Sequence, residues 1–194
     1  MDEAELAVGI RAGDERAYEA LVRSEAGRLF AVTRRILGND EDARDAVQEA
    51  FISAFKARGQ FGGGSKVSTW IHRIAVNAAL SKLRSRRRHP EENIDDLLPR
   101  FLPNGHHTER FTSWTEPADQ IVARKETAEL VRRTIDQLPE SFRMAVLLRD
   151  IEGMSTDEAA QMLGTTANAL KLRLHRARLA LRTLLAPHFG GTTA

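Results

Sequence analysis

The chain has 194 residues, enough for one large domain or two small ones, and its 42% hydrophobic content is sufficient for buried cores. It contains no cysteine, which excludes disulfides, thiolate metal sites, cysteine nucleophiles and direct thiol sensing. No apolar run approaches the roughly 18 residues of a membrane helix. The acidic start, residues 1–5, is unlike the basic start of a signal peptide. These features predict a cytoplasmic protein without membrane insertion.

The net charge of +2 conceals an uneven distribution of charge along the chain. Residues 1–60 are net acidic, residues 61–90 hold seven Lys or Arg and no acid, and residues 91–126 are net acidic again. Charge that alternates in blocks indicates electrostatic partners for particular segments of the protein.

The first half of the chain is expected to form helices separated by glycines. Residues 2–12 and 15–37 predict helices that end at the C-capping residues Gly13 and Gly38. A third helix, capped by Asn39 or Asp40, should end at Gly59. It carries a one-sided apolar stripe, made of Ala43, Ala46, Val47, Ala50, Phe51, Ala54 and Phe55. A fourth helix is expected from about Ser68 to Arg88.

The second half begins with a proline-rich stretch, residues 89–120, which predicts a linker with at most one helical turn at residues 94–98. Beyond it, the sequence predicts helices over residues 120–137, 140–152, 155–163 and 167–186, the last ending before Pro187. We therefore expect an all-α fold of two small helical domains joined by a flexible linker. The expected boundaries are 1–88, 89–124 and 125–194.

Residues 155–186 are the most informative part of the sequence. The capping box of Ser155 and Glu158 opens a short helix, and a turn at Gly164 leads to a long basic helix, the layout of a helix-turn-helix. The long helix should bury one row of residues, Leu170, Leu174, Ala177, Leu181 and Leu184. Its five Lys or Arg, without any acid, suit the major groove of duplex DNA. The plainer alternative is a solvated basic face on an ordinary bundle helix.

The acid-free segment 61–90 combines its cations with the rings of Phe61, Trp70 and His72. Cations mixed with aromatic rings suit single-stranded or distorted nucleic acid, in which exposed bases can stack. The alternative is an amphipathic helix that simply buries its apolar residues, Trp70, Ile71, Ile74 and Leu80.

Three other patterns suggest enzyme or metal chemistry, and each lacks an essential part. Residues 62–66 lack the Gly-Lys-Ser/Thr order and the preceding strand of a phosphate-binding loop. His106 and His107 have no third ligand at a convincing spacing. Asp95 and Asp96 lie on the linker, where nothing holds them in catalytic geometry. We therefore expect no catalytic activity, no metal and no cofactor.

Three stretches of the chain resemble the extracytoplasmic-function (ECF) alternative sigma factors, which are promoter-specificity subunits of bacterial RNA polymerase. Residues 40–51 (DEDARDAVQEAF) resemble the helix that binds core polymerase, and residues 68–79 (STWIHRIAVNAA) resemble the promoter-melting segment. Residues 138–143 (LPESFR) and 164–178 resemble the C-terminal promoter-reading domain. The resemblance covers roughly residues 10–88 and 125–186, with the three motifs in the family's order.

The resemblance implies that residues 1–88 bind core polymerase and open the minus-10 element, and that residues 125–194 read the minus-35 element as duplex. The implied partners are core RNA polymerase (its β′ clamp and β flap), promoter DNA and an anti-sigma factor. The implied polymerase-binding residues are Asp42, Asp45, Gln48, Glu49 and Ile52. The implied minus-10 contacts are Trp70, Arg73, Asn77, Ala78, Lys82, Arg84, Arg86, Arg87 and Arg88. The implied minus-35 contacts are Thr166, Asn168, Lys171, Leu172, Arg173, His175, Arg176 and Arg178.

The recognition helix departs from the family pattern at two positions. Ala169 replaces the usual Thr or Ser, and Leu172 replaces a small polar residue, so the family's hydroxyl contacts are missing and Leu172 is available for thymine methyls. Two rival functions stay open from the sequence. One is a stand-alone helix-turn-helix regulator that binds duplex DNA as a dimer without polymerase, and the other is an RNA-binding protein that uses residues 61–90.

The linker acids also allow two interpretations. Glu91, Glu92, Asp95 and Asp96 follow directly on the Arg84–Arg88 cluster. They belong either to a solubilising tether or to an acidic strand that mimics RNA phosphates inside polymerase.

Overall fold

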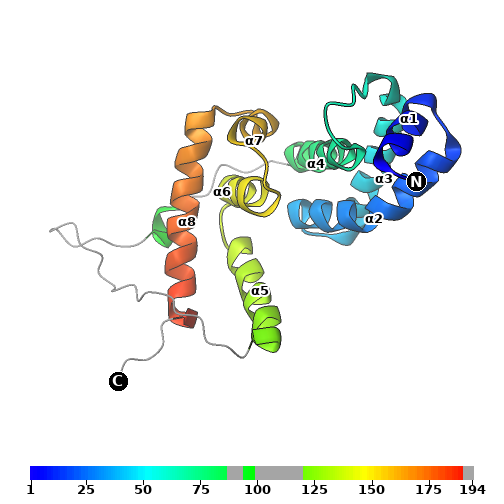
Figure 1. Cartoon of the computed structure of the whole chain (residues 1–194). Helices are drawn as coiled ribbons and strands as arrows, with labels where there is room; N and C mark the ends of the chain where they lie inside the picture. The colour runs from blue at the N-terminus through cyan, green and yellow to red at the C-terminus, as the bar shows by residue number, and fades with distance from the viewer. Residues whose placement is uncertain (87–93, 99–119, 190–194) are drawn as a thin grey trace. The chain divides into compact units, whose positions relative to one another are not determined.

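The computed structural model describes residues 1–86, 94–98 and 120–189, with residues 120–125 described by backbone alone. The chain divides into two compact units, Met1–Arg88 and His89–Ala194 (Figure 1). The described residues form helices and turns and contain no strand, which confirms the expected all-α fold class. None of the described helices is both long and apolar enough to cross a membrane.

The first unit contains α1 (Glu3–Ala12), α2 (Glu15–Leu37), α3 (Asp40–Lys56), the 3₁₀ turn η1 (Arg58–Gln60) and α4 (Val67–Arg86). The expected caps are confirmed. Gly13 and Gly38 have φ angles of 76° and 77°, in the left-handed region that favours glycine, and their N–H groups donate to carbonyls of the last turn. The side chain of Asn39 accepts the N–H of Asp42 and begins α3.

The third helix differs from its expected form in two respects. It ends at Lys56 rather than at Gly59, because the chain tightens there into η1, where the N–H of Gln60 donates to the carbonyl of Ala57 three residues earlier. Phe55, expected in the apolar stripe, is 46% exposed. It occupies the edge of that stripe, where its ring meets the edge of the Tyr18 ring at 5.0 Å.

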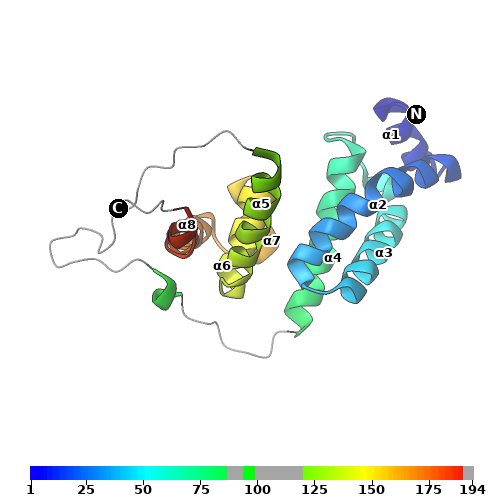
Figure 2. The same ribbon diagram turned by 90° about the horizontal axis from the view of Figure 1, so that it is seen from below.

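Small side chains allow close packing at the centre of this unit. Ala43, Ala46, Ala50 and Ala54 are fully buried, and α3 packs against both α2 and α4, which lie beside it in Figure 2. A carboxylate oxygen of Glu3 accepts the N–H of Val67 at 2.6 Å, so α1 supplies an acid to the positive end of α4. These contacts fix α3 and α4 side by side, and both carry candidate functional residues.

The second unit contains η2 (Asp95–Leu97), α5 (Gln120–Asp136), α6 (Glu140–Val146), the π-helical segment η3 (Leu147–Ile151), α7 (Thr156–Leu163) and α8 (Ala167–Phe189). The continuous α-helix expected over residues 140–152 changes to π geometry at Leu147, with the N–H of Glu152 donating to the carbonyl of Leu147. Helix α8 continues through Pro187 instead of ending before it. Since Pro187 lies in the last turn, its missing N–H removes one hydrogen bond only.

Helix α8 forms the core of this unit and packs against α5, α6 and α7. Leu170, Leu174 and Ala177 are buried as expected. Further along, Ala180 and Leu185 are buried in place of Leu181 and Leu184, which are half-buried. Helix α5 lies along this C-terminal half of α8 (Figure 1), and the periodicity of α8 alone does not show its neighbours.

Candidate functional site

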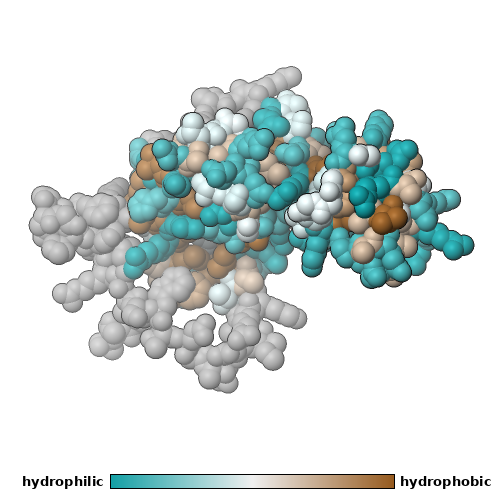
Figure 3. Space-filling model, turned by 45° about the horizontal axis from the view of Figure 1, so that its top comes forward, coloured by the Kyte–Doolittle hydropathy of each residue, from teal (hydrophilic) through white to brown (hydrophobic). Residues whose placement is uncertain are grey.

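One face of α3 presents the residues expected to bind polymerase. Asp45, Glu49 and Ile52 follow one another at intervals of four and three residues, so they share a side of the helix, and Gln48 lies beside them. All four are exposed, and Ile52 is 47% exposed although it is a large apolar residue. In the view of Figure 3 the surface of this unit is mainly hydrophilic, with a small hydrophobic patch. A face that combines acids with an exposed isoleucine suits a protein partner.

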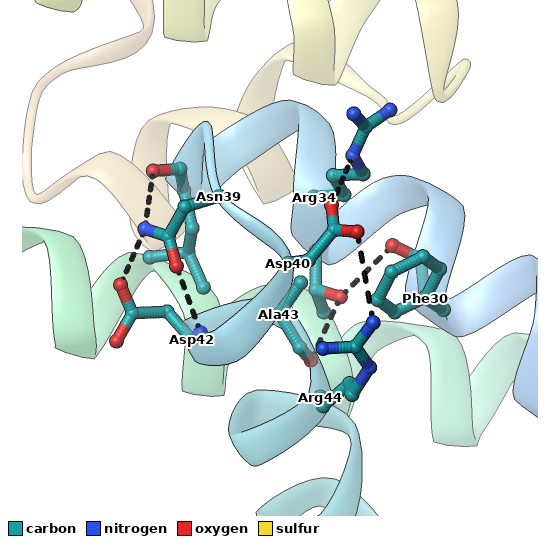
Figure 4. Close-up of polar contacts among 9 residues, drawn as sticks. Phe30, Arg34, Asn39, Asp40, Asp42, Ala43 and Arg44 are labelled. Carbon is teal, nitrogen blue, oxygen red and sulfur yellow. Dashed lines mark hydrogen bonds and ion pairs between the residues drawn. The ribbon is translucent and has the colours of Figure 1, made fainter.

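The fifth residue of this set, Asp42, is largely engaged inside the unit. Its side chain is 14% exposed and forms an ion pair with Arg86 of α4. It also accepts a hydrogen bond from the side-chain amide of Asn39 (Figure 4). The hydrogen bonds from Asn39 and Arg86 hold the pKa of Asp42 below its ordinary value.

The turn that precedes this face is fixed by polar contacts between α2 and α3 (Figure 4). The buried hydroxyl of Thr33 lies 2.9 Å from the carbonyl of Leu29 and 3.2 Å from that of Ala43. Arg34 donates to Asp40 at 2.6 Å. The start of α3 is therefore held by α2, and the orientation of the acidic face follows from the fold.

The candidate minus-10 residues separate onto two faces of α4. Trp70, Asn77 and Arg84 are spaced seven residues apart, two turns of helix, so they share one face, and Arg73 lies on it three residues after Trp70. Lys82 and Arg86, four residues apart, face α3 instead. Lys82 Nζ lies 3.2 Å from Asp45 Oδ2.

Two candidate sets therefore meet through the ion pairs Asp42–Arg86 and Asp45–Lys82. The sequence did not reveal this pairing, because the partners lie about forty residues apart. The remaining candidates of the set, Arg87 and Arg88, lie outside the described residues.

The aromatic residues of this segment take different positions. The Trp70 ring is half-buried and lies 5.0 Å from the Phe61 ring at an angle of 40°, so it is packed on one side and accessible on the other. His72 is 5% exposed, which corrects its place among nucleic-acid-facing rings. Asn77 is exposed and Ala78 half-buried. An accessible ring and cations on one helix face suit single-stranded DNA, whose bases can stack on the ring while the cations contact its phosphates.

The helix-turn-helix expected in the second unit is present as α7, a turn and α8. Ser155 and Glu158 form the predicted capping box, and Gly164, with φ 63°, turns the chain between the helices. Thr166 Oγ1 accepts the N–H of Ala169 at 3.2 Å and so caps α8. Thr166 was expected only to contact DNA, and its capping role was not identified from the sequence.

The first turns of α8 present an exposed polar face. Asn168, Lys171 and His175 are exposed, and Leu172 is 61% exposed with its apolar side chain in solvent. Arg173 is half-buried. Cations beside an exposed apolar side chain can reach phosphates, base edges and thymine methyls in a major groove.

Two arginines of α8 already have acidic partners in the same unit. The guanidinium of Arg178 donates to both carboxylate oxygens of Asp150 in η3, at 3.0 and 2.6 Å, and these bonds raise its pKa. Arg176 forms an ion pair with Asp95 of η2. Neither acid was recognised as part of the site, because each is distant in sequence from α8.

Known proteins resemble the chain over both units. The family Sigma-70 region 2 matches residues 21–89, which include α3 and α4, and the family Sigma-70, region 4 matches residues 128–181, which include the helix-turn-helix. The ECF RNA polymerase sigma factor SigM of Mycobacterium tuberculosis is 36% identical over 183 residues, 94% of this chain and 84% of that protein. The chain belongs to the ECF RNA polymerase sigma factors.

Further sigma factors are similar to this ECF sigma factor over most of its length. The RNA polymerase sigma-H factor of Pseudomonas aeruginosa is 33% identical over 92% of this chain and 91% of its own length, and the sigma-E factor of Escherichia coli K12 is 31% identical over the same shares. Among solved structures, CnrH in complex with the cytosolic domain of CnrY has a TM-score of 0.56 and 27% identity, covering 94% of this chain and 96% of that one. The RpoE factor of Bartonella quintana, at 23% identity over 87% of this chain and 96% of that one, has a TM-score of 0.55 and supports the fold alone.

Proposed function

We propose that this ECF sigma factor binds core RNA polymerase in the cytoplasm and directs it to a defined set of promoters, with no catalytic activity of its own. The observation that carries the proposal is that regions 2 and 4 match in order within one chain, each over a unit with an exposed candidate surface. A stand-alone helix-turn-helix regulator is not favoured, because it leaves the match over residues 21–89 without a purpose.

The acidic face of α3 is the proposed contact with the polymerase clamp. Gln48, Glu49 and Ile52 are exposed there. Asp45 is also exposed, but its carboxylate is shared with Lys82. We expect Glu49 and Ile52 to contribute most, because both are exposed and Glu49 forms no ion pair with the described residues.

The two DNA elements are assigned to different helices. The α4 face of Trp70, Arg73, Asn77 and Arg84 takes the melted minus-10 strand, on which a flipped base needs a pocket and a backbone grip. The exposed face of α8, centred on Lys171 and Leu172, takes the minus-35 duplex. The solved structure of CnrH contains a bound CnrY domain. By analogy we propose that an anti-sigma protein restrains this chain as well.

A binding experiment with charge-reversed α3 tests the polymerase contact. The double variant Glu49→Lys, Ile52→Ser should keep its helical content, because both residues are exposed. It should lose association with core polymerase in gel filtration, because like charges across an interface cost several kcal/mol. Glu15→Lys, an exposed acid of α2, is the control and should associate normally. A folded double variant that associates like the wild type would remove the clamp role from this face.

A further inference from the structure

A short piece of the linker is docked on α8. The segment of residues 94–98, with η2 at its centre, packs against α8 although about eighty residues separate the two in sequence (Figure 1). Ile94 is buried, with 1% of its surface exposed, and Asp95 forms an ion pair with Arg176. The segment is thus held by one apolar anchor and one charge-assisted contact.

The segment covers a specific side of α8. Leu172, Arg176 and Leu179 are spaced by four and three residues, so they share a face that turns away from the buried row of Leu170 and Ala177. Leu172, near the start of this face, is 61% exposed. Arg176 and Leu179, further along, are half-buried. Figure 1 shows η2 on the side of α8 opposite to α5 and α6. The exposed half of the face is the one proposed for DNA, and the docked segment adjoins it.

We propose that residues 94–98 compete with promoter DNA for α8, at Arg176. This inference depends on the proposed function, since it assumes that α8 faces the minus-35 duplex. A guanidinium paired with the Asp95 carboxylate is not available to a phosphate or a guanine edge. The neighbouring carboxylate of Asp96 is exposed and repels DNA phosphates. The segment must therefore leave before DNA occupies this part of the helix.

The competition weakens DNA binding according to the fraction of molecules in which the segment is released. The apparent dissociation constant equals the intrinsic dissociation constant divided by this released, binding-competent fraction. A segment docked about four-fifths of the time weakens binding about fivefold. Release of the segment, by any partner that holds the linker elsewhere, then strengthens minus-35 binding without a change in α8.

Two neighbouring acids provide a matched pair of variants. Asp95→Asn removes the pair with Arg176, and Asp96→Asn removes the same charge from a carboxylate that forms no ion pair with the described residues. In the full chain, Asp95→Asn should tighten binding to a minus-35 duplex about fivefold, measured by fluorescence anisotropy, and Ile94→Ser should act in the same direction. Asp96→Asn should stay within about twofold of the wild type. Equal DNA affinities for the two Asn variants would overturn the proposal, because the loss of one negative charge near the DNA would then explain the effect of Asp95→Asn without any release of the segment.

A spin label separates failure of this proposal from failure of the proposed function. Because the chain has no cysteine, Asp96→Cys can carry a single nitroxide. The label should be immobilised in the free protein, become mobile when the duplex is added, and be mobile without DNA when Asp95→Asn is also present. Binding that needs Lys171 but leaves the label immobile overturns the competition while the function stands. Binding that is insensitive to Lys171→Ala removes the DNA-facing role of α8 and overturns both.

Discussion

Lys171 and Arg178 lie on the same helix, yet Lys171→Ala should mainly affect DNA binding and Arg178→Ala mainly stability. Lys171 is exposed and forms no ion pair with the described residues, so Lys171→Ala should change the free energy of unfolding by less than about 0.5 kcal/mol. Arg178→Ala removes two hydrogen bonds to Asp150, which is 29% exposed. Because Arg178 is itself 57% exposed, the loss is about 0.5–1 kcal/mol. That loss lowers the melting temperature of the unit by roughly 2–8 °C.

The two changes should affect DNA binding in the reverse order. Each cation that neutralises a phosphate contributes about 0.9 to the slope of log affinity against log salt. Over a fourfold rise from about 50 to 200 mM, one such contact accounts for about a 3.5-fold loss of affinity. The loss of DNA affinity between about 50 and 200 mM salt should therefore be about 3.5-fold smaller for Lys171→Ala than for the wild type. For Arg178→Ala the slope of log affinity against log salt should change by less than half as much as for Lys171→Ala, because Asp150 already neutralises that guanidinium.

The assay uses the full chain and a duplex selected by its holoenzyme from a random promoter library. Fluorescence anisotropy between about 50 and 200 mM salt gives the slope, and thermal melting followed by circular dichroism gives the stability. An unchanged slope and affinity for Lys171→Ala would refute the DNA-facing role of α8. A salt slope reduced as much by Arg178→Ala as by Lys171→Ala would refute the structural role of the Arg178–Asp150 pair.

The other predictions concern the packing, the acid stability and the turns that hold these surfaces. Ala50→Leu should destabilise the first unit by about 1–3 kcal/mol in urea denaturation, because Ala50 is fully buried between helices. The control Gln48→Ala, at an exposed position of the same helix, should cost less than about 0.5 kcal/mol. Equal losses of stability for the two variants would contradict the close packing. The lowered pKa of Asp42 means that its contribution to stability is present above the ordinary aspartate range, about 3.9, and is lost as the pH falls through the lower folded-state pKa. The stability difference between wild type and Asp42→Asn should therefore vanish at low pH, and a difference that persists there would exclude the carboxylate as its source. Gly164→Ala should cost about 1–2 kcal/mol, because φ is 63° and a Cβ there meets no atom within 4 Å, so the cost is conformational. Gly27→Ala, inside α2 and equally uncrowded, should stabilise the protein by about 0.5–1 kcal/mol. A loss of stability in both glycine variants would show that the left-handed backbone at Gly164 is not the cause of its cost.

Local features of the fold were predictable from the sequence because their causes lie within a few residues. The caps at Gly13, Gly38 and Asn39, and the capping box of Ser155 with Glu158, were identified from neighbouring residue types alone. The apolar periodicity also indicated the buried alanines of α3.

Features that depend on tertiary contacts were not predictable in the same way. The ring of Phe55 fits the apolar period of α3 but is 46% exposed, because Tyr18 and Arg58 cover it only in part. The change to π geometry at Leu147 is likewise not indicated by the residue pattern of 140–152, which fits a continuous α-helix. The sequence pattern alone therefore shows neither feature.

The same distinction applies to the candidate site. Residue type and helical spacing indicated the exposed Lys171 and Glu49. They did not indicate which charges are already paired, since Asp150 and Asp95 lie 28 and 81 residues from the arginines that they bind. The structure therefore ranks candidates that the sequence had treated as equal.

Run-off transcription with purified components tests the central claim most directly. Core polymerase, the full chain and a duplex promoter library should yield transcripts with defined start sites, preceded by common minus-10 and minus-35 sequences. Core polymerase alone, or core polymerase with the Glu49→Lys, Ile52→Ser variant, should yield none of these starts. Binding of the chain to duplex DNA as a dimer, with no promoter-specific transcript in the presence of core polymerase, would contradict the assignment as a sigma factor.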